Sequence, residues 1–128
     1  MIDDMGIFRT SIEVANVATD ARRRVLRDVM VDTGSEYNWI PSDVLIDLGV
    51  APIRIERFKT ANGAVIERPI GFAMLHAGSR YAPCIVVFAE SNDMVLLGAI
   101  GLESMNLCVD LVTKELVPAG PVPVASAA

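Results

Sequence analysis

Hydrophobic and polar residues alternate along much of the chain with the two-residue repeat that is typical of β-strands. The first such segment places its larger side chains on one side: Phe8, Thr10, Ile12 and Val14. A half-buried strand is therefore expected from Phe8 onward, extending to Val17. Residues 18–21 should form a turn, and a second strand, Arg24–Val31, should follow it.

The middle of the chain predicts a tight hairpin. Ile53 and Ile55 alternate with charged residues, as in a half-buried strand. The dipeptide Asn62-Gly63 then separates Ile55–Ala61 from Ala64–Ile66. Asn-Gly between two β-forming segments is a strong signal for a two-residue turn.

A second hairpin should join Phe72–Leu75 to Cys84–Ala89, and the continuous apolar segment Ile85–Phe88 predicts a strand buried on both faces. Pro69 cannot donate a hydrogen bond to a ladder, so it should lie at a sheet edge or a bulge. His76 should be exposed or capped beside the turn. A Cys84/His76 nucleophile pair would need a third, orienting group, and the sequence offers none.

Two short helices interrupt the strands. Ser42 is the expected cap of the first, which ends at Gly49. The second covers Ala99–Met105 and should bury Ile100, Leu102 and Met105. A last hairpin should pair Leu107–Leu111 with Glu115–Val117, and residues 119–128 are expected to form a flexible tail. The pattern therefore predicts a single all-β domain, residues 1–118, with one or two short helices.

The strand that ends at Val31 leads into a short acid, a hydroxyl residue and a glycine: Asp32-Thr33-Gly34-Ser35. Gly34 can adopt backbone angles that other residues avoid, so the chain can turn sharply and leave the Asp32 carboxylate at a rigid edge. The hydroxyls of Thr33 and Ser35 are close enough to orient that carboxylate or the loop backbone. An ordinary hairpin turn would use the same residue types.

Residues 32–42 are similar to the active-site segment of pepsin-type aspartic proteases, Asp-Thr-Gly-Ser-x-x-x-Trp-[Ile/Val]-Pro-Ser, over eleven positions. At 128 residues the chain is far shorter than those two-lobed enzymes. It therefore more closely resembles the single-lobe, retropepsin-like (clan AA type) aspartic proteases. This resemblance implies a closed acid-protease barrel lobe that acts as a homodimer on an extended peptide or protein substrate, without a cofactor or a metal ion.

Two further elements carry the resemblance. The hairpin at Asn62-Gly63 resembles the flap that closes over substrate, although a plain surface hairpin would have the same sequence. Val95–Gly98 resembles the hydrophobic-hydrophobic-glycine element behind the catalytic loop, where a bulky strand packs and a glycine admits a second backbone. The residues expected to bind substrate are Asn62, Gly63, Ala64, Val65, Ile66, Leu96, Leu97 and Gly98.

Composition narrows the function classes. The chain is 52% hydrophobic and 21% charged, as expected for a compact domain. Its net charge of -5 makes nucleic acid an unexpected partner, and the basic run at residues 22–24 should form a solvated turn. Cys84, Cys108 and a single histidine suit neither a zinc site nor a hydrolytic triad. No secretory signal or membrane-spanning segment is visible, so we expect free, buried thiols and a cytoplasmic location.

Peptide hydrolysis by carboxyl groups requires two of them, one ionised to deprotonate a water and one protonated to polarise the scissile carbonyl. Two such groups at hydrogen-bonding distance share a proton and titrate as a pair. Only Asp32 is followed by a hydroxyl residue and a glycine. The hypothesis is therefore that Asp32 of each subunit meets its counterpart at a two-fold axis. The resemblance implies that Thr33 ties the two loops together and that Ser35 supports the outer carboxylate oxygen.

Some features depart from the family pattern. Ala99 stands where retroviral members carry an arginine, so Glu36 lacks its expected partner, and the hairpin has no tyrosine to bond Trp39. The alternative function is therefore a catalytically inactive module for dimerisation or peptide binding. The phosphate-binding acid loops of sugar kinases and actin-like proteins share the Asp-x-Gly-x-Ser pattern, but they need two larger domains.

Overall fold

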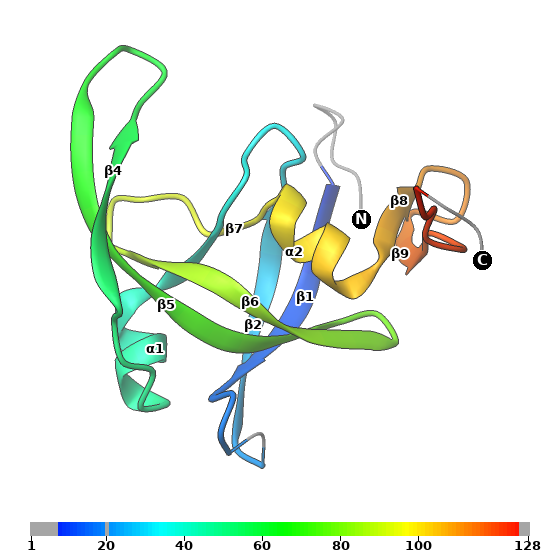
Figure 1. Cartoon of the computed structure of the whole chain (residues 1–128), viewed down its shortest axis with the longest axis horizontal. Coiled ribbons are helices and arrows are strands. Elements are labelled where there is room, and N and C mark those ends of the chain that lie inside the picture. The colour runs from blue at the N-terminus through cyan, green and yellow to red at the C-terminus, as the bar shows by residue number, and fades with distance from the viewer. Residues whose placement is uncertain (1–7, 20, 126–128) are drawn as a thin grey trace.

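A computed structural model describes residues 8–19 and 21–125, and its strands form a barrel with one projecting hairpin (Figure 1). The fold class predicted from the sequence, all-β with two short helices, is confirmed. In chain order the elements are β1 (Phe8–Ala15), β2 (Arg23–Val31), β3 (Asn38–Pro41), α1 (Ser42–Asp47), β4 (Arg54–Lys59), β5 (Val65–Ala77), β6 (Arg80–Ala89), β7 (Leu96–Leu97), α2 (Ala99–Met105), β8 (Leu107–Asp110) and β9 (Glu115–Pro118).

The barrel closes through a pairing between its first and fifth strands. The large sheet has the order β1-β2-β7-β3-β6-β5-β4, and β1 also pairs with β5. This additional pairing joins all the strands of the large sheet except β4 into a ring, and full closure removes exposed edges from those strands. Fully buried side chains such as Ile12, Ile40 and Leu75 fill the interior. The predicted closed barrel is therefore confirmed.

Three strands meet beneath the loop that carries Asp32. The two-residue strand β7 pairs in parallel with the end of β2, through Met30↔Leu96 and Val31↔Leu97. On its other side β7 pairs with β3 through Trp39↔Leu96. The loop at residues 32–37 therefore passes from β2 to β3 across the end of β7.

The strand β4 and the first part of β5 form the hairpin that projects from the barrel in Figure 1. Their register runs from Arg54↔Ile70 to Lys59↔Val65. The pairing of β5 with β6 begins only at Ile70↔Val87. Pro69 lies just before this point, where β5 has β4 as its ladder partner, so it occupies the predicted edge position.

Several local predictions are wrong in detail. The strand β1 ends at Ala15 rather than Val17, because Asn16 begins a turn: its Oδ1 accepts from the Ala18 N–H at 2.8 Å. Part of the predicted turn at residues 18–21, residue 20, lies outside the described residues. Helix α1 starts at Ser42 itself without a side-chain cap. Instead Asp43 Oδ1 accepts from the Val44 N–H at 3.0 Å.

Two surface predictions also need correction. Ile53 and Ile55 are 50% and 57% exposed rather than half-buried, because the inward face of the projecting strand carries Glu56 and Phe58. The basic run at residues 22–24 is not a solvated turn, since its last two residues begin β2. Arginines at positions 22 and 24 pair with Asp47 at 2.6 and 2.8 Å.

The C-terminal strands β8 and β9 form a separate two-stranded sheet on the side of the barrel away from the projecting hairpin (Figure 1). Beyond β9, the Ala119 N–H donates to the Asn106 carbonyl at 2.8 Å, and Asn106 Nδ2 donates to the Gly120 carbonyl at 2.8 Å. The boundary at residue 118 and the flexible tail stay predictions. Across residues 8–19 and 21–125, neither helix is long and apolar enough to cross a membrane.

Candidate active site

The Asp32 loop has a defined backbone conformation that orients the carboxylate. The Asp32 N–H donates to the Leu97 carbonyl at 2.9 Å, which joins the loop to β7. The Ser35 N–H returns to the Asp32 carbonyl at 3.1 Å, and the Gly34 N–H donates to Asp32 Oδ1 at 2.9 Å. A carboxylate that accepts a backbone N–H in this way has a fixed direction. Asp32 is half-buried, so its side chain stays within reach of a ligand.

Gly98 lies directly behind this loop. A Cβ at that position would lie 2.7 Å from the Ser35 carbonyl oxygen and 2.9 Å from that of Glu36, so a larger residue does not fit. Immediately after it, the backbone N–H groups of Ala99 and Ile100 donate to those same carbonyls at 2.7 and 2.9 Å. Backbone bonds from the start of α2 therefore secure the loop at the place where the family pattern has an arginine.

Asn38 is a structural support of the site that the sequence reasoning missed. It is 0% exposed, its Oδ1 accepts from the Gly98 N–H at 2.9 Å, and its Nδ2 donates to the Ile85 carbonyl at 2.9 Å. Both ends of the buried amide are thus satisfied, and they link the loop, β6 and the start of α2. An asparagine between Tyr37 and Trp39 at the start of a buried strand was the available signal.

A hollow of about 440 Å³ lies between the Asp32 loop and the projecting hairpin. It brings together four of the residues predicted for the site: Asp32, Ser35, Ile66 and Leu96. Hairpin residues Thr60 and Ala61, the residues Asn92, Asp93 and Met94, and Trp39 line the rest of the hollow. The carboxylate therefore opens into a mainly apolar space that hairpin residues help to enclose.

The other predicted site residues lie around this hollow rather than in its lining. Thr33 and Gly34 are exposed at the outer edge of the loop, and Leu97 and Gly98 are buried behind it. Asn62, Gly63, Ala64 and Val65 are exposed at the hairpin tip. There Gly63 has a φ of 89° and Asn62 Oδ1 accepts from the Ala64 N–H at 3.2 Å. The turn is longer than the predicted two-residue turn, because the strand pairing ends at Lys59↔Val65 and the Thr60 N–H donates to the Ala64 carbonyl at 2.7 Å.

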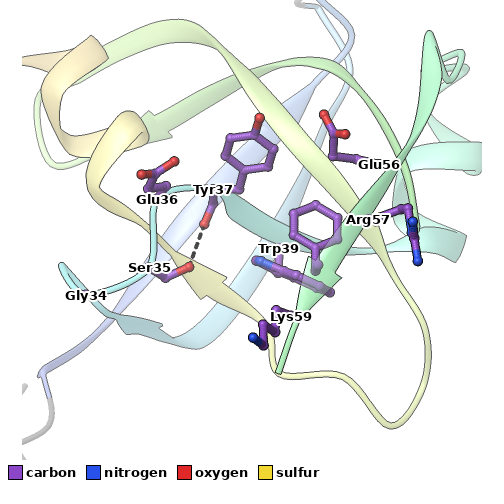
Figure 2. Close-up of a pocket in the computed structure, with 9 residues that line it drawn as sticks. Gly34, Ser35, Glu36, Tyr37, Trp39, Glu56, Arg57 and Lys59 are labelled. Atoms are coloured by element: carbon purple, nitrogen blue, oxygen red, sulfur yellow. Dashed lines mark hydrogen bonds between the residues drawn. The ribbon is translucent and has the colours of Figure 1, made fainter. Parts of the chain in front are cut away.

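An aromatic contact connects the hairpin to the barrel. The Phe58 ring of β4 lies 4.9 Å from the Trp39 ring and 5.6 Å from the Tyr37 ring, both in edge or tilted geometry. Figure 2 shows Tyr37 and Trp39 facing Glu56 and Lys59 of β4 across a second hollow, of about 490 Å³. Ser35 and Trp39 line both hollows, so the two hollows are neighbours, and together they are called the cleft below.

An ion pair makes a further contact between the hairpin and the barrel. Arg68 Nε lies 2.6 Å from Asp93 Oδ2, and Arg68 Nη2 lies 3.0 Å from Asp93 Oδ1, so the pair is bidentate. The hydrogen bonds from Arg68 lower the pKa of the Asp93 carboxyl below its ordinary value. Asp93 thus stays ionised, and it is unsuited to share a proton with Asp32 although it lines the same hollow.

An apolar hollow of about 480 Å³ lies on the other side of Asp32. Residues from β1, β2 and β8 and the loop after β8 line it beside the acid: Phe8, Met30, Val31, Val109 and Leu111. Thr33 completes this lining, and Leu111 is 69% exposed. Among the described residues, the exposed Leu111 and the half-buried Val31 and Val109 therefore form an apolar surface beside the carboxylate.

The cysteines and the histidine form no second reactive centre. Burial raises the pKa of the Cys84 thiol to about 11, so it stays protonated at neutral pH. Cys108 is exposed, which corrects the prediction that both thiols are buried. His76 stacks on Tyr81 at 5.1 Å. Within residues 8–19 and 21–125, no group of His, Cys, Asp and Glu side chains is arranged to hold a metal ion.

Comparison with known proteins finds a likeness in structure. No family model matches the sequence, and no curated protein matches it either. The structure is similar to the solution structure of Simian Foamy Virus (mac) protease, with 19% sequence identity and a TM-score of 0.49. The match covers 73% of this chain and 92% of that one.

Proposed function

We propose that this protein is a retropepsin-like aspartic endopeptidase that acts as a homodimer. One observation carries the proposal: the Asp32 carboxylate, oriented by the Gly34 N–H at 2.9 Å, faces a mainly apolar hollow, and hairpin residues help to enclose the cleft to which this hollow belongs. Such a cleft suits an extended peptide with apolar side chains near the scissile bond. The match of residues 32–42 to the aspartic-protease motif supports the same function.

The dimer follows from the need for a second carboxyl group. Hydrolysis requires one ionised and one protonated acid, and Asp93 cannot supply the protonated one because Arg68 keeps it charged. A second copy would bring its own Asp32, and the apolar surface beside Asp32, formed by Val31, Val109 and Leu111, is suitable for self-association. Asp32 of one subunit would then activate a water while its counterpart polarises the substrate carbonyl.

Cleavage of dye-labelled casein at mildly acidic pH tests the proposal. We expect Asp32→Asn to abolish cleavage while circular dichroism stays unchanged. Asp28→Asn is the matched control, because Asp28 is an exposed acid on the preceding strand with a positive φ of 56° that asparagine tolerates. Equal cleavage by Asp32→Asn and Asp28→Asn would overturn the assignment. No cleavage by any variant would favour the inactive binding module.

Sedimentation velocity tests the dimer separately. Leu111→Asp should shift the protein to monomer and remove cleavage, because it introduces a charge into the apolar surface beside Asp32. Val17→Asp is the control: Val17 is also exposed, but it lies in the turn after β1, outside the lining of that surface. Full activity of a strictly monomeric wild-type protein would contradict the homodimer.

A further inference from the structure

The Arg68–Asp93 pair differs from the other ion pairs of the described residues in its burial. Its two side chains are 14% and 13% exposed, whereas both partners of the Arg22–Asp47, Arg23–Glu13, Arg24–Asp47 and Arg54–Glu56 pairs are at least 35% exposed. Exposed pairs contribute little, while a shielded, bidentate pair is stronger and directionally specific. This pair therefore has the geometry to fix the position of the segments that carry it.

Those two segments are the hairpin and a wall of the Asp32 cleft. Arg68 lies on β5 opposite Glu56 of β4, in the part of β5 that has not yet reached β6. Asp93 lies in the connection between β6 and β7, where residues 92–94 line the hollow that contains Asp32. The pair therefore connects the hairpin directly to the cleft wall.

Further bonds keep both partners in place. Asp93 Oδ2 accepts from the Glu90 N–H at 2.8 Å, and the Asp93 N–H donates to the Glu90 carbonyl at 2.9 Å, so its loop is a closed turn. Arg68 Nη1 donates to the Glu67 carbonyl at 2.8 Å and lies 3.4 Å from the Glu90 carboxylate. The guanidinium and the carboxylate are each oriented by bonds outside the pair, which favours a single geometry of the ion pair over several.

We infer that Arg68 and Asp93 are positioning residues that hold the hairpin over the cleft and thereby set how tightly peptide binds. This inference rests on the proposed function. Neither residue performs chemistry: Arg68 acts through the hairpin, and Asp93 acts through the loop at residues 92–94. Loss of the pair should increase the population of conformations with the hairpin displaced, and binding weakens in proportion to the competent population that is lost.

Trp39 provides a test that needs no enzymatic activity. It is the single tryptophan of the chain, it contacts Phe58 of the hairpin, and it lines the Asp32 hollow. Acrylamide quenching of its fluorescence should increase about twofold in Arg68→Met and Asp93→Asn as the hairpin moves away. Arg54→Met is the matched control, because it removes an exposed pair from the neighbouring strand of the same hairpin. Equal quenching in wild type, Arg68→Met, Asp93→Asn and Arg54→Met would overturn the inference.

Kinetics with dye-labelled casein separate positioning from simple loss of structure. We expect Arg68→Met and Asp93→Asn to raise KM about tenfold with kcat within about twofold of wild type. A purely structural role would lower the active fraction, and so kcat, without changing KM. Arg68→Lys should restore KM only in part, because an ammonium cannot form the bidentate contact. A KM unchanged in Arg68→Met and Asp93→Asn would overturn the inference.

The double variant Arg68→Asp/Asp93→Arg covers the case in which a single variant fails to fold. Exchange of the charges should return quenching and KM toward wild-type values, whereas values no better than those of the single variants would count against the inference. If no variant cleaves casein, the proposed protease function fails, and the quenching comparison still decides whether the pair positions the hairpin. If wild type cleaves and quenching is uniform, only the positioning role fails.

Discussion

The Asp32 loop and the β4–β5 hairpin face the same cleft but are stabilised by different kinds of contact. Backbone hydrogen bonds from Asp32, Ala99 and Ile100 secure the loop, together with the buried amide of Asn38. The hairpin contacts the barrel through the Phe58 ring and the Arg68 guanidinium, which are side-chain contacts. The backbone of the loop is thus bonded directly to core elements, whereas the hairpin is held to the barrel by side chains. Changes behind the loop should affect folding, and changes in the hairpin should affect binding.

Gly98→Ala should lower the free energy of unfolding more than any other substitution considered. A small loss would contradict the idea that the loop is better supported than the hairpin. The added Cβ would lie 2.7 Å from the Ser35 carbonyl oxygen, which belongs to backbone and cannot move independently. We expect a loss of about 4 kcal/mol in the free energy of unfolding, or no folded protein at all. Urea denaturation followed by circular dichroism measures it.

Gly63→Ala is the control for that substitution at the hairpin tip. No atom lies within 4 Å of the position a Cβ would take there, but φ is 89°. Only backbone strain of about 1–2 kcal/mol should therefore appear. Equal losses for Gly98→Ala and Gly63→Ala would mean that the loop is no better supported than the hairpin.

Asn38→Ala should have the next largest effect. It leaves the Gly98 N–H and the Ile85 carbonyl without their partner in a fully buried place. A cost of about 3 kcal/mol in the free energy of unfolding is expected, because each unsatisfied buried group is expensive. Asn92→Ala, at an exposed position, is the control, and it should change the free energy of unfolding by no more than about 0.5 kcal/mol in the same urea titration. A loss below about 1 kcal/mol for Asn38→Ala would show that water or a rearrangement replaces the amide.

Both regions contain features that the sequence predicted well, because local patterns determine them. The hairpin around Asn62-Gly63 and the helix at residues 99–105 follow from neighbouring residues, and both are present, although the turn is longer than two residues and Ile100 is only half-buried. The close approach of Gly98 to the acid loop was predicted from the two motifs, Asp32–Ser35 and Val95–Gly98, and it is present. The closed barrel was implied by the resemblance to retropepsin-like aspartic proteases, whereas the alternating pattern alone indicated only an all-β domain.

The features that the sequence could not predict depend on contacts between distant segments. Ile55 was expected to face inward, but the barrel offers aromatic partners to Phe58 on the other face of β4. The bonds of Asn38 join positions 47 and 60 residues away. Arg68 and Asp93 are 25 residues apart and read as ordinary surface charges in the sequence. Such pairings become visible only once the strand order is known.

Phe58→Ala sharpens the comparison from the hairpin side. The ring is half-buried, so its loss should cost only about 1 kcal/mol in unfolding free energy. It should nevertheless increase acrylamide quenching of Trp39, whose ring lies 4.9 Å away. Phe72→Ala is the control, since Phe72 is an exposed phenylalanine on β5 that does not line the cleft. If Phe58→Ala destabilised the protein as strongly as Asn38→Ala, the hairpin would belong to the core.

Lowering the pH should change the position of the hairpin less than any of these substitutions, until the pH is low enough to protonate Asp93. Arg68 holds the pKa of Asp93 below its ordinary value of 3.8, so the pair stabilises the hairpin above pH 3.8 and loses that contribution as the pH falls through the lower, folded value. Glu90, the other acid beside Arg68, is 65% exposed and 3.4 Å away, so it contributes little to holding the hairpin. Trp39 quenching should therefore stay constant from about pH 7 to about pH 4 and increase only below that range.

The measurement belongs in the Asp32→Asn background, because Asp32 lines the same hollow as Trp39. Asp93→Asn in that background should give high quenching at every pH, and a transition between pH 5 and pH 6 that Asp93→Asn does not remove would assign the change to another group.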